Sequence, residues 1–281
     1  MHPYLQLMRI KSWKELSYFC LLGILVSKTF SLIPAFTIYL AVCIASSSIF
    51  VINNIYDASC DTSEEKKIKN PIVEGKIKRG HAQLFAILLF CVSLLLFSLF
   101  LTSYNLLLVI VGILLAYLYS IPPLRFKERP PTDIFFHGII PSISFLFSYT
   151  TFAPLSSEVL LFTLAVIFLG GGMSLMHQLQ DFAVDAQHNL KTSAIIYGKK
   201  KASCASSILF SGALFILLYL SASGFLTWFL IPLILSAFYV PVKIFLERER
   251  EEFAPLISYL RRFINVIFSA IVITLVADII L

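Results

Sequence analysis

Long apolar stretches follow one another from one end of this sequence to the other, and polar residues gather in the segments between them. A helix needs about 20 apolar residues to cross a hydrocarbon core of about 30 Å. Stretches of about that length lie at residues 16–33, 36–56, 82–101, 104–122, 134–152, 158–177, 203–222, 225–245 and 259–280. The pattern predicts an all-α integral membrane protein with nine transmembrane helices, forming a single transmembrane domain over residues 1–281.

The composition favours a location in lipid. Hydrophobic residues make up 58% of the 281 positions and charged residues 14%, whereas an average soluble domain carries about 25% charged residues. The first apolar run could be mistaken for a secretory signal peptide, but it lacks a small-residue cleavage site and a second run follows at once, so we expect a retained helix. The five cysteines form no Cys-x-x-Cys pair, and we expect them to be free thiols that pack in apolar surroundings.

The basic residues predict the orientation of the chain. Short loops rich in Lys and Arg mark the cytoplasmic side of a membrane protein. With the spans given above, Lys28 is the only one of the 22 Lys and Arg residues on the opposite side. The N-terminus is therefore predicted to be cytoplasmic. The net charge of +6 reflects this asymmetry, so it is a topology signal and we expect no nucleic-acid partner.

Two pairs of aspartates lie at the ends of the second and the sixth predicted span. Asp57 and Asp61 form the first pair, and Asp181 and Asp185 form the second. Residues four apart lie on one face of a helix, where like charges destabilise it. Helix stability thus does not explain the pairs. A divalent cation does, because Mg²⁺ takes oxygen ligands from a few carboxylates and from substrate phosphates.

The two acidic segments are in register with each other. An offset of 124 residues relates Asn53 to His177, and it also relates Asp57 to Asp181, Asp61 to Asp185 and Lys67 to Lys191. Four spans separate the segments, so the pattern predicts pseudo-duplicated four-helix units that bring both pairs to the same side of the membrane. One pair alone is typical of a solvated helix end. Two in register, with four of the chain's six aspartates, favour a metal site for a phosphate or diphosphate.

The segment from Asn53 to Asp61 resembles the first motif of the UbiA superfamily of membrane prenyltransferases, Asn-Asp-x-x-Asp-x-x-x-Asp. Asp181 and Asp185 are similar to the second motif of that family. Further segments that resemble family segments are Leu7 to Trp13, Tyr119 to Lys127, and Lys191-Thr192 followed by Gly198. The ordered set covers nearly the whole chain. The run from Tyr119 to Lys127 is similar to that of quinone, chlorophyll and carotenoid-modifying members, including lycopene elongase-like ones.

Three positions depart from the family pattern. Asn54 stands where the family commonly has Asp, Gln178 stands at the corresponding place in the second motif, and Asn70-Pro71 replaces a frequent Arg-Pro. A neutral amide still coordinates a metal or forms hydrogen bonds, so the departures leave the core metal ligands in place. The subfamily stays open.

The resemblance implies Mg²⁺-dependent transfer of a prenyl group from an allylic prenyl diphosphate to a lipophilic acceptor within the membrane. It implies two Mg²⁺ ions, held by the catalytic aspartates and one amide: Asp57, Asp61, Asp181, Asp185 and Asn53. The implied substrate-binding residues are Arg9, Asn54, Lys67, Tyr119, Arg125, Lys127 and Lys191. Arg125 could instead anchor its own loop. The ring of Tyr56 or Tyr119 could stabilise the allylic cation.

The predicted location is the plasma membrane or another energy-transducing membrane, with the active site facing the cytoplasm. His177 and His188 flank the second acidic pair and are weaker candidates for a ligand or a base. His81 and His137 are expected to be ordinary polar residues at helix ends.

Other functions fit parts of the pattern. A terpene cyclase of the same superfamily would use the same metal site without an acceptor. An inverted-repeat secondary transporter also fits nine spans, but its ionisable residues should lie near the bilayer midplane, whereas those here lie at helix ends on one side. A phosphatidyltransferase of the CDP-alcohol type would need an Asp-Gly-x-x-Ala-Arg segment, which the sequence lacks. The acceptor, the prenyl chain length and the oligomeric state stay open.

Overall fold

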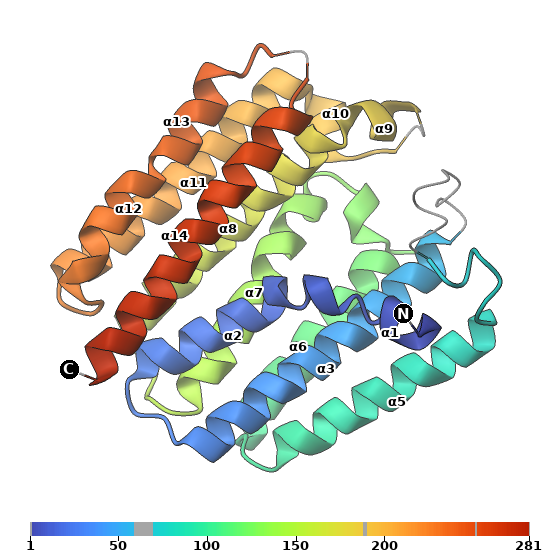
Figure 1. Cartoon of the computed structure of the whole chain (residues 1–281), viewed down its shortest axis with the longest axis horizontal. Helices are drawn as coiled ribbons and strands as arrows, with labels where there is room; N and C mark the ends of the chain where they lie inside the picture. The colour runs from blue at the N-terminus through green and yellow to red at the C-terminus, as the bar shows by residue number, and fades with distance from the viewer. Residues whose placement is uncertain (1, 59–69, 188–189, 251, 281) are drawn as a thin grey trace. The chain divides into compact units, whose positions relative to one another are not determined.

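The computed structural model describes residues 2–58, 70–187, 190–250 and 252–280, and every regular element in these ranges is a helix (Figure 1). The described chain divides into two compact units. The first comprises the chain up to Arg125 together with Ile143–Ala153, and the second comprises Phe126–Ser142 together with Pro154 to the C-terminus. The all-helical prediction is confirmed for the part of the chain that is described.

The first unit is built around α3, Leu32–Asp57, which packs along α5 (Figure 1). The other helical segments that begin in this unit are α1 (Pro3–Leu7), η1 (Ile10–Ser12), α2 (Lys14–Ser27), α5 (Arg79–Ser98) and α6 (Ser103–Ser120). Buried aliphatic residues of α3, such as Ile38 and Val42, join one core with Phe97 of α5. Thr102 caps α6 by accepting a hydrogen bond from the Asn105 backbone.

The second unit is built around α8, Ser157–Gln180, which packs along α11 and also contacts α14. Its other helical segments are η2 (Phe126–Glu128), α9 (Phe182–Gln187), α10 (Ser193–Tyr197), α11 (Lys199–Ala222), η3 (Trp228–Leu230), α12 (Ile231–Ala237), α13 (Tyr239–Leu246) and α14 (Ala254–Ile280). Helix α7, Thr132–Thr150, begins in this unit and ends in the first. The core joins Leu175 and Leu179 of α8 to Ile257 of α14.

Seven helical segments are long and apolar enough to cross a membrane, namely Leu32–Asp57, Arg79–Ser98, Ser103–Ser120, Ser157–Gln180, Lys199–Ala222, Trp228–Leu246 and Ala254–Ile280. Helix α2 is apolar but has only 14 residues, and α7 is not among the seven. The polar side chains of Asp133 and His137 lower the hydropathy of α7. The prediction of a multi-helix membrane protein therefore agrees with the structure, while the number nine stays a prediction.

Helix ends differ from the predicted spans for local reasons. The first span was predicted to reach residue 33, but α2 ends at Ser27, where Lys28 takes up a left-handed conformation with φ 57°. Pro34 falls between the predicted spans 16–33 and 36–56, but it lies in the first turn of α3, where proline costs no helical hydrogen bond. The eighth span divides into α12 and α13 because Pro241 lacks an N–H and its ring would clash with the carbonyl of Ala237.

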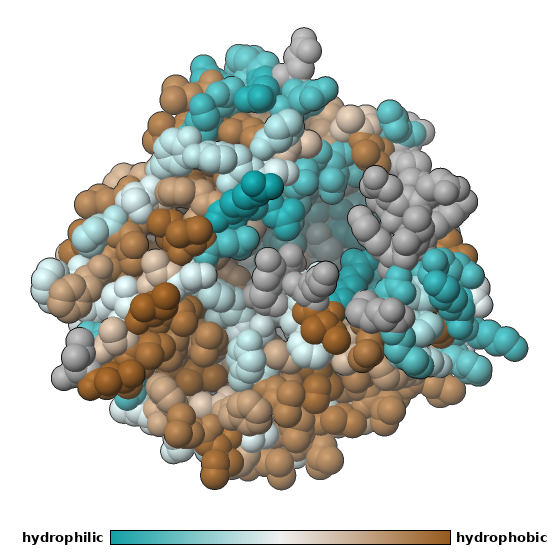
Figure 2. All heavy atoms as spheres, viewed as in Figure 1, coloured by the Kyte–Doolittle hydropathy of each residue, from teal (hydrophilic) through white to brown (hydrophobic). Residues whose placement is uncertain are grey.

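The exposed faces of the long helices are apolar, as a lipid environment requires. On α5 the exposed large side chains include Leu84, Ile87, Leu88 and Leu95. Hydrophobic residues cover most of the surface along this helix (Figure 2). In water such a continuous apolar patch would favour aggregation, whereas in a bilayer it matches the acyl chains.

The helix bounds repeat with the same offset as the acidic motifs. Adding 124 to the bounds of α3 gives 156–181, and α8 spans 157–180. Adding 124 to the bounds of α6 gives 227–244, and the span from η3 to α13 covers 228–246. The register seen in the aspartates is thus a register of whole helices.

Helices α7 and α8 approach closely at two glycines. A Cβ atom on Gly170 would lie 2.5 Å from the Cα of Gly138 and 2.6 Å from the carbonyl oxygen of His137. Any side chain at Gly170 would therefore force the two backbones apart. The same two helices also bring the rings of His137 and His177 into contact, with their centroids 5.8 Å apart and their planes at 88°.

Candidate functional site

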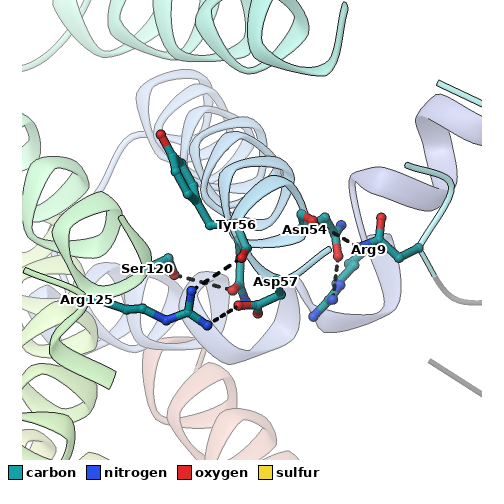
Figure 3. Close-up of polar contacts among 8 residues, drawn as sticks. Arg9, Asn54, Tyr56, Asp57, Ser120 and Arg125 are labelled. Atoms are coloured by element: carbon teal, nitrogen blue, oxygen red, sulfur yellow. Dashed lines mark hydrogen bonds and ion pairs between the residues drawn. The ribbon is translucent and has the colours of Figure 1, made fainter. Parts of the chain in front are cut away.

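The first acidic motif starts at Asp57, the last residue of α3. The guanidinium of Arg125 lies against it: Nη2 is 3.4 Å from Asp57 Oδ1, and Nη1 donates to the carbonyl of Tyr56 at 3.4 Å (Figure 3). Arg125 has a left-handed backbone, with φ 37°, which turns the chain after α6. Arg125 therefore anchors its loop on the end of α3 and contacts a predicted metal ligand.

Asn53 lies one helical turn before Asp57, so both side chains occupy one face of α3. Ser120, at the end of α6, donates to Asn53 Oδ1 at 3.4 Å (Figure 3). The ring of Tyr56 points away from the contact between Arg125 and Asp57 (Figure 3). The Arg79 guanidinium lies 5.3 Å from the centroid of that ring. Tyr56 thus attracts a cation of the protein itself.

Asn54 is fully buried and serves as a clamp between three segments of the first unit. Its Oδ1 accepts a hydrogen bond from Arg9 Nη2, and its Nδ2 donates to the carbonyl of Leu7 at 3.1 Å (Figure 3). Asn70, also buried, donates from Nδ2 to the carbonyl of Asn54 at 2.9 Å. Arg9 has φ 47°, a left-handed conformation that the clamp holds in place. The amide of Asn54 is therefore engaged in fixing Arg9, a predicted substrate-binding residue.

The second acidic motif lies where α8 gives way to α9. Asp181 caps α8, and Asp185 is a buried residue of the short helix α9. The Asp185 amide donates to the Asp181 carbonyl at 2.9 Å, so one helical turn still separates the two residues although α8 has ended. The predicted spacing of this pair along one helical turn is retained.

A network of hydrogen bonds around Asp133 holds the chain that follows this motif. The carboxylate of Asp133, at the start of α7, is fully buried. Its Oδ1 accepts from Ser193 Oγ at 2.6 Å, and its Oδ2 accepts from the Ser193 amide at 2.8 Å and from Gln178 Nε2 at 2.9 Å. Gln178 Oε1 in turn accepts from the Ala194 amide at 2.9 Å. Both ends of the segment carrying Asp181 and Asp185 are thereby tied to one carboxylate.

The two buried amides occupy equivalent positions. The offset of 124 residues that relates the acidic motifs also relates Asn54 to Gln178, and it relates Arg9 to Asp133. Each amide bonds to the residue 45 positions before it, a cation in the first unit and an anion in the second. The repeat thus preserves the contact and reverses the charge of the partner.

The residues around the two motifs supply the oxygen ligands that Mg²⁺ prefers. Asn53, Asp57, Asp181 and Asp185 offer amide and carboxylate oxygens, without thiolate or imidazole among them. In the described ranges no three His, Cys, Asp or Glu side chains gather into a metal-holding group. Mg²⁺ commonly takes one or two carboxylates and completes its shell with water and phosphate. The donors of each motif therefore fit a magnesium ion.

The model of the UbiA prenyltransferase family matches residues 16–267. This chain belongs to the UbiA family. The match covers most of the chain and agrees with the motifs that carried the resemblance. No curated protein sequence matches the chain.

Solved structures share the UbiA fold of this chain. A UbiA homolog from Archaeoglobus fulgidus bound to GPP and Mg²⁺ matches with a TM-score of 0.81 and 21% identity, over 99% of this chain and 100% of that one. A structure of digeranylgeranylglyceryl phosphate synthase matches with a TM-score of 0.78 and 22% identity, over 99% and 98%. A UbiA homolog from Aeropyrum pernix K1 matches with a TM-score of 0.72 and 22% identity, over 95% and 98%. These identities are low, so the similarity is one of fold.

The other predicted UbiA site residues are distributed over both units. Tyr119 lies in the last turn of α6 and Lys127 in η2, both partly exposed, and Lys191 is exposed between α9 and α10. Asp61, Lys67 and His188 lie outside the described residues. His137, expected near a helix end, lies in the second turn of α7 against the ring of His177.

Sequence reasoning missed Asp133 and the contacts of Asn70. Asp133 lies at the edge of an apolar run, and a carboxylate there indicates a buried charge with hydrogen-bond partners, because an unpaired buried charge is costly. Asn70 was noted only as a departure from the family pattern, yet its side chain donates a hydrogen bond to the Asn54 carbonyl. The two contacts share a spacing: Asn70 lies 16 residues after Asn54, and Ala194 lies 16 residues after Gln178.

Proposed function

We propose that this UbiA-family protein transfers a prenyl group from an allylic prenyl diphosphate to a lipophilic acceptor in the membrane, with two Mg²⁺ ions. The observation that carries the proposal is the pair of acidic motifs in register at the ends of α3 and α8. UbiA homologs from Archaeoglobus fulgidus bound to GPP and Mg²⁺ and to DMAPP and Mg²⁺ support it, because they share the fold.

Each acidic motif holds one ion in this proposal. Asp57, Asp61 and Asn53 would hold the first, and Asp181 and Asp185 would hold the second. When bound, magnesium neutralises the charge that builds up on diphosphate as the C–O bond breaks. The clamp at Asn54 and the network around Asp133 support this role, because each ties a motif to neighbouring chain and so orients its carboxylates.

Basic residues bind the diphosphate oxygens. Arg9, Lys67, Lys127 and Lys191 are proposed for direct contact, since guanidinium and ammonium groups suit phosphate. Arg125 has a second task, because its contact with Asp57 orients that carboxylate. The ring of Tyr56 points away from Asp57 (Figure 3) and lies against the Arg79 guanidinium, so the ring of Tyr119 is the better candidate for stabilising the allylic cation.

The proposed topology has nine spans, built from pseudo-duplicated four-helix units and a ninth helix. The N-terminus lies in the cytoplasm, and the active site opens to the cytoplasmic face of the plasma membrane or another energy-transducing membrane. The distribution of Lys and Arg supports this orientation. The repeat of helix bounds supports the duplication.

The test is a product assay with membranes that contain the full chain. The membranes are incubated with Mg²⁺ and prenyl diphosphates of graded length, with and without candidate acceptors, and the lipids are read by mass spectrometry. We expect prenylated acceptor only when donor, acceptor and Mg²⁺ are all present. Product formed from the diphosphate alone would replace transfer by cyclisation. Transport of a solute without any new lipid would refute enzymatic function.

A further inference from the structure

A group of polar side chains lies inside the second unit, apart from the aspartates. His177 and Gln180 are three residues apart on α8 and therefore share a face. The ring of His137, from α7, meets that of His177 edge to face with 5.8 Å between the centroids. Arg261, from α14, donates from Nη1 to Gln180 Oε1 at 3.3 Å. Three apolar helices thus bring four polar side chains together.

Two features of this group call for a ligand. The Nε2 atom of His177 is buried, and no described residue forms a hydrogen bond with it. Arg261 is partly buried and has no carboxylate within ion-pair distance in the ranges that the structure covers, so its charge lacks a counter-charge there. Ionisable side chains in transmembrane helices are costly and commonly mark a functional site. An anion would meet both requirements.

The chemistry of the group differs from that of the acidic motifs. It combines a guanidinium with imidazole and amide groups and contains no carboxylate, so it binds an anion directly and needs no metal. A guanidinium fork suits a phosphate or carboxylate head, because two parallel N–H groups can face two oxygens. Gln180 takes one of the five N–H donors of Arg261, which leaves a fork for a ligand.

We propose that His177, Gln180 and Arg261, with His137 packed behind them, recognise the anionic head group of the lipophilic acceptor. The acceptor is then a lipid with a phosphate or carboxylate head. Gln180 directly precedes Asp181, and His177 lies one helical turn before it, about 6 Å along the axis. A head group held here sits next to a carboxylate proposed to bind the donor's metal. This inference rests on the proposed function.

The test measures binding apart from turnover. The full chain is placed in a bilayer of neutral phosphatidylcholine, without Mg²⁺ or prenyl diphosphate. Binding of a long-chain alkyl phosphate is compared with that of the alcohol of the same chain length. We expect the phosphate to bind at least tenfold more tightly, and Arg261→Gln to abolish the difference. Arg262→Gln is the matched control, because Arg262 is the exposed next residue and should leave the binding unchanged.

Kinetics then separate acceptor from donor. In the presence of Mg²⁺ and donor, Arg261→Gln should raise the KM for an anionic acceptor roughly tenfold or more while the KM for the prenyl diphosphate stays as in wild type. Arg261→Lys should recover part of the loss. A higher KM for the prenyl diphosphate in Arg261→Gln would mean that Arg261 binds the diphosphate, and this would overturn the proposal. Equal binding of the alkyl phosphate and the alcohol by wild type would also overturn it.

Two further outcomes separate the anion site from the acceptor assignment and from the proposed transferase activity. Displacement of the alkyl phosphate by anionic phospholipid in the host bilayer would mean that the group binds bulk lipid, which overturns the assignment to the acceptor. Tight binding of alkyl phosphate through Arg261, without any prenylated product from wild type, would uphold the anion site and refute the proposed transferase.

Discussion

Gln178 donates a hydrogen bond to the fully buried carboxylate of Asp133 at 2.9 Å, and its carbonyl oxygen accepts one from the Ala194 amide. The neutral amide does both, whereas an ionised carboxylate can only accept. Gln178→Glu would place a second carboxylate against Asp133 and remove a donor, so we expect the free energy of unfolding to fall by about 2 kcal/mol or more. Thermal unfolding of the detergent-solubilised protein measures this.

Gln180→Glu is the matched control for that variant. Gln180 lies two residues further along α8 and meets the guanidinium of Arg261, so a carboxylate there gains a counter-charge and should not lower the melting temperature. The double variant Asp133→Asn, Gln178→Glu should regain part of the loss, because amide and carboxylate then face each other with exchanged places. An unchanged melting temperature in Gln178→Glu alone would contradict the role of Gln178 in the network around Asp133.

Chelation should abolish activity. Carboxylates repel a diphosphate unless a cation lies between them, so prenyl transfer should require Mg²⁺ or Mn²⁺ and cease in excess EDTA. The assay follows prenylated lipid by mass spectrometry, with activity restored by added Mg²⁺ as the control. Full turnover in excess EDTA would be incompatible with a two-metal site.

The two acidic motifs should act as one unit. Asp57→Asn and Asp181→Asn should each lower turnover by about 10²–10³ or more, because each removes charge needed as the leaving group departs. Groups that act together are non-additive, so the double variant should be little worse than the worse single one. Purified yield and thermal stability should stay close to wild type, because the carboxylates repel each other within each pair and this relief offsets the loss of the 3.4 Å contact between Asp57 and Arg125.

Asp278→Asn is the control for these substitutions. Asp278 lies near the end of α14, outside both motifs, and its loss should leave turnover within about twofold of wild type. If either motif variant is correctly folded and turns over like Asp278→Asn, that motif is only a solvated helix end.

Cysteine labelling should report the topology. In a variant without native cysteines, Tyr104→Cys and Leu155→Cys should react with a membrane-impermeant maleimide from outside. Tyr104 is exposed in the first turn of α6, and Leu155 is exposed in the connection before α8. Lys127→Cys and Lys199→Cys should react only after the membrane is opened. Labelling of the second group in intact cells would reverse the orientation.

Much of the fold could be predicted from the sequence, because hydropathy alone sets the position of long lipid-facing helices. Helices α5, α6 and α8 begin and end within about three residues of the predicted spans. The early end of α2 at Lys28 and the division at Pro241 depend on single backbone conformations that a hydropathy window averages out.

The types of residue in the candidate site could be predicted from the sequence, whereas most of their hydrogen-bond partners could not. The four-residue spacing within each aspartate pair is visible in the sequence, and residues four apart on a helix lie on the same face. The contact of Arg125 with Asp57 joins residues 68 positions apart through a left-handed turn, and no local pattern predicts which carboxylate a loop cation will meet. Hydrogen-bond partners of this kind follow from the packing of whole helices.

The opposite charges of Arg9 and Asp133 bear on how the two repeated halves evolved. If the two halves descend from one ancestral segment, the neutral amides at positions 54 and 178 allowed the partner residue to change sign without losing the contact, since an amide can face either charge. A half with an acidic residue in place of Gln178 would have no such tolerance. Homologous chains should therefore show coupled substitution, with an acid at the position of Gln178 only where the position of Asp133 is neutral or basic.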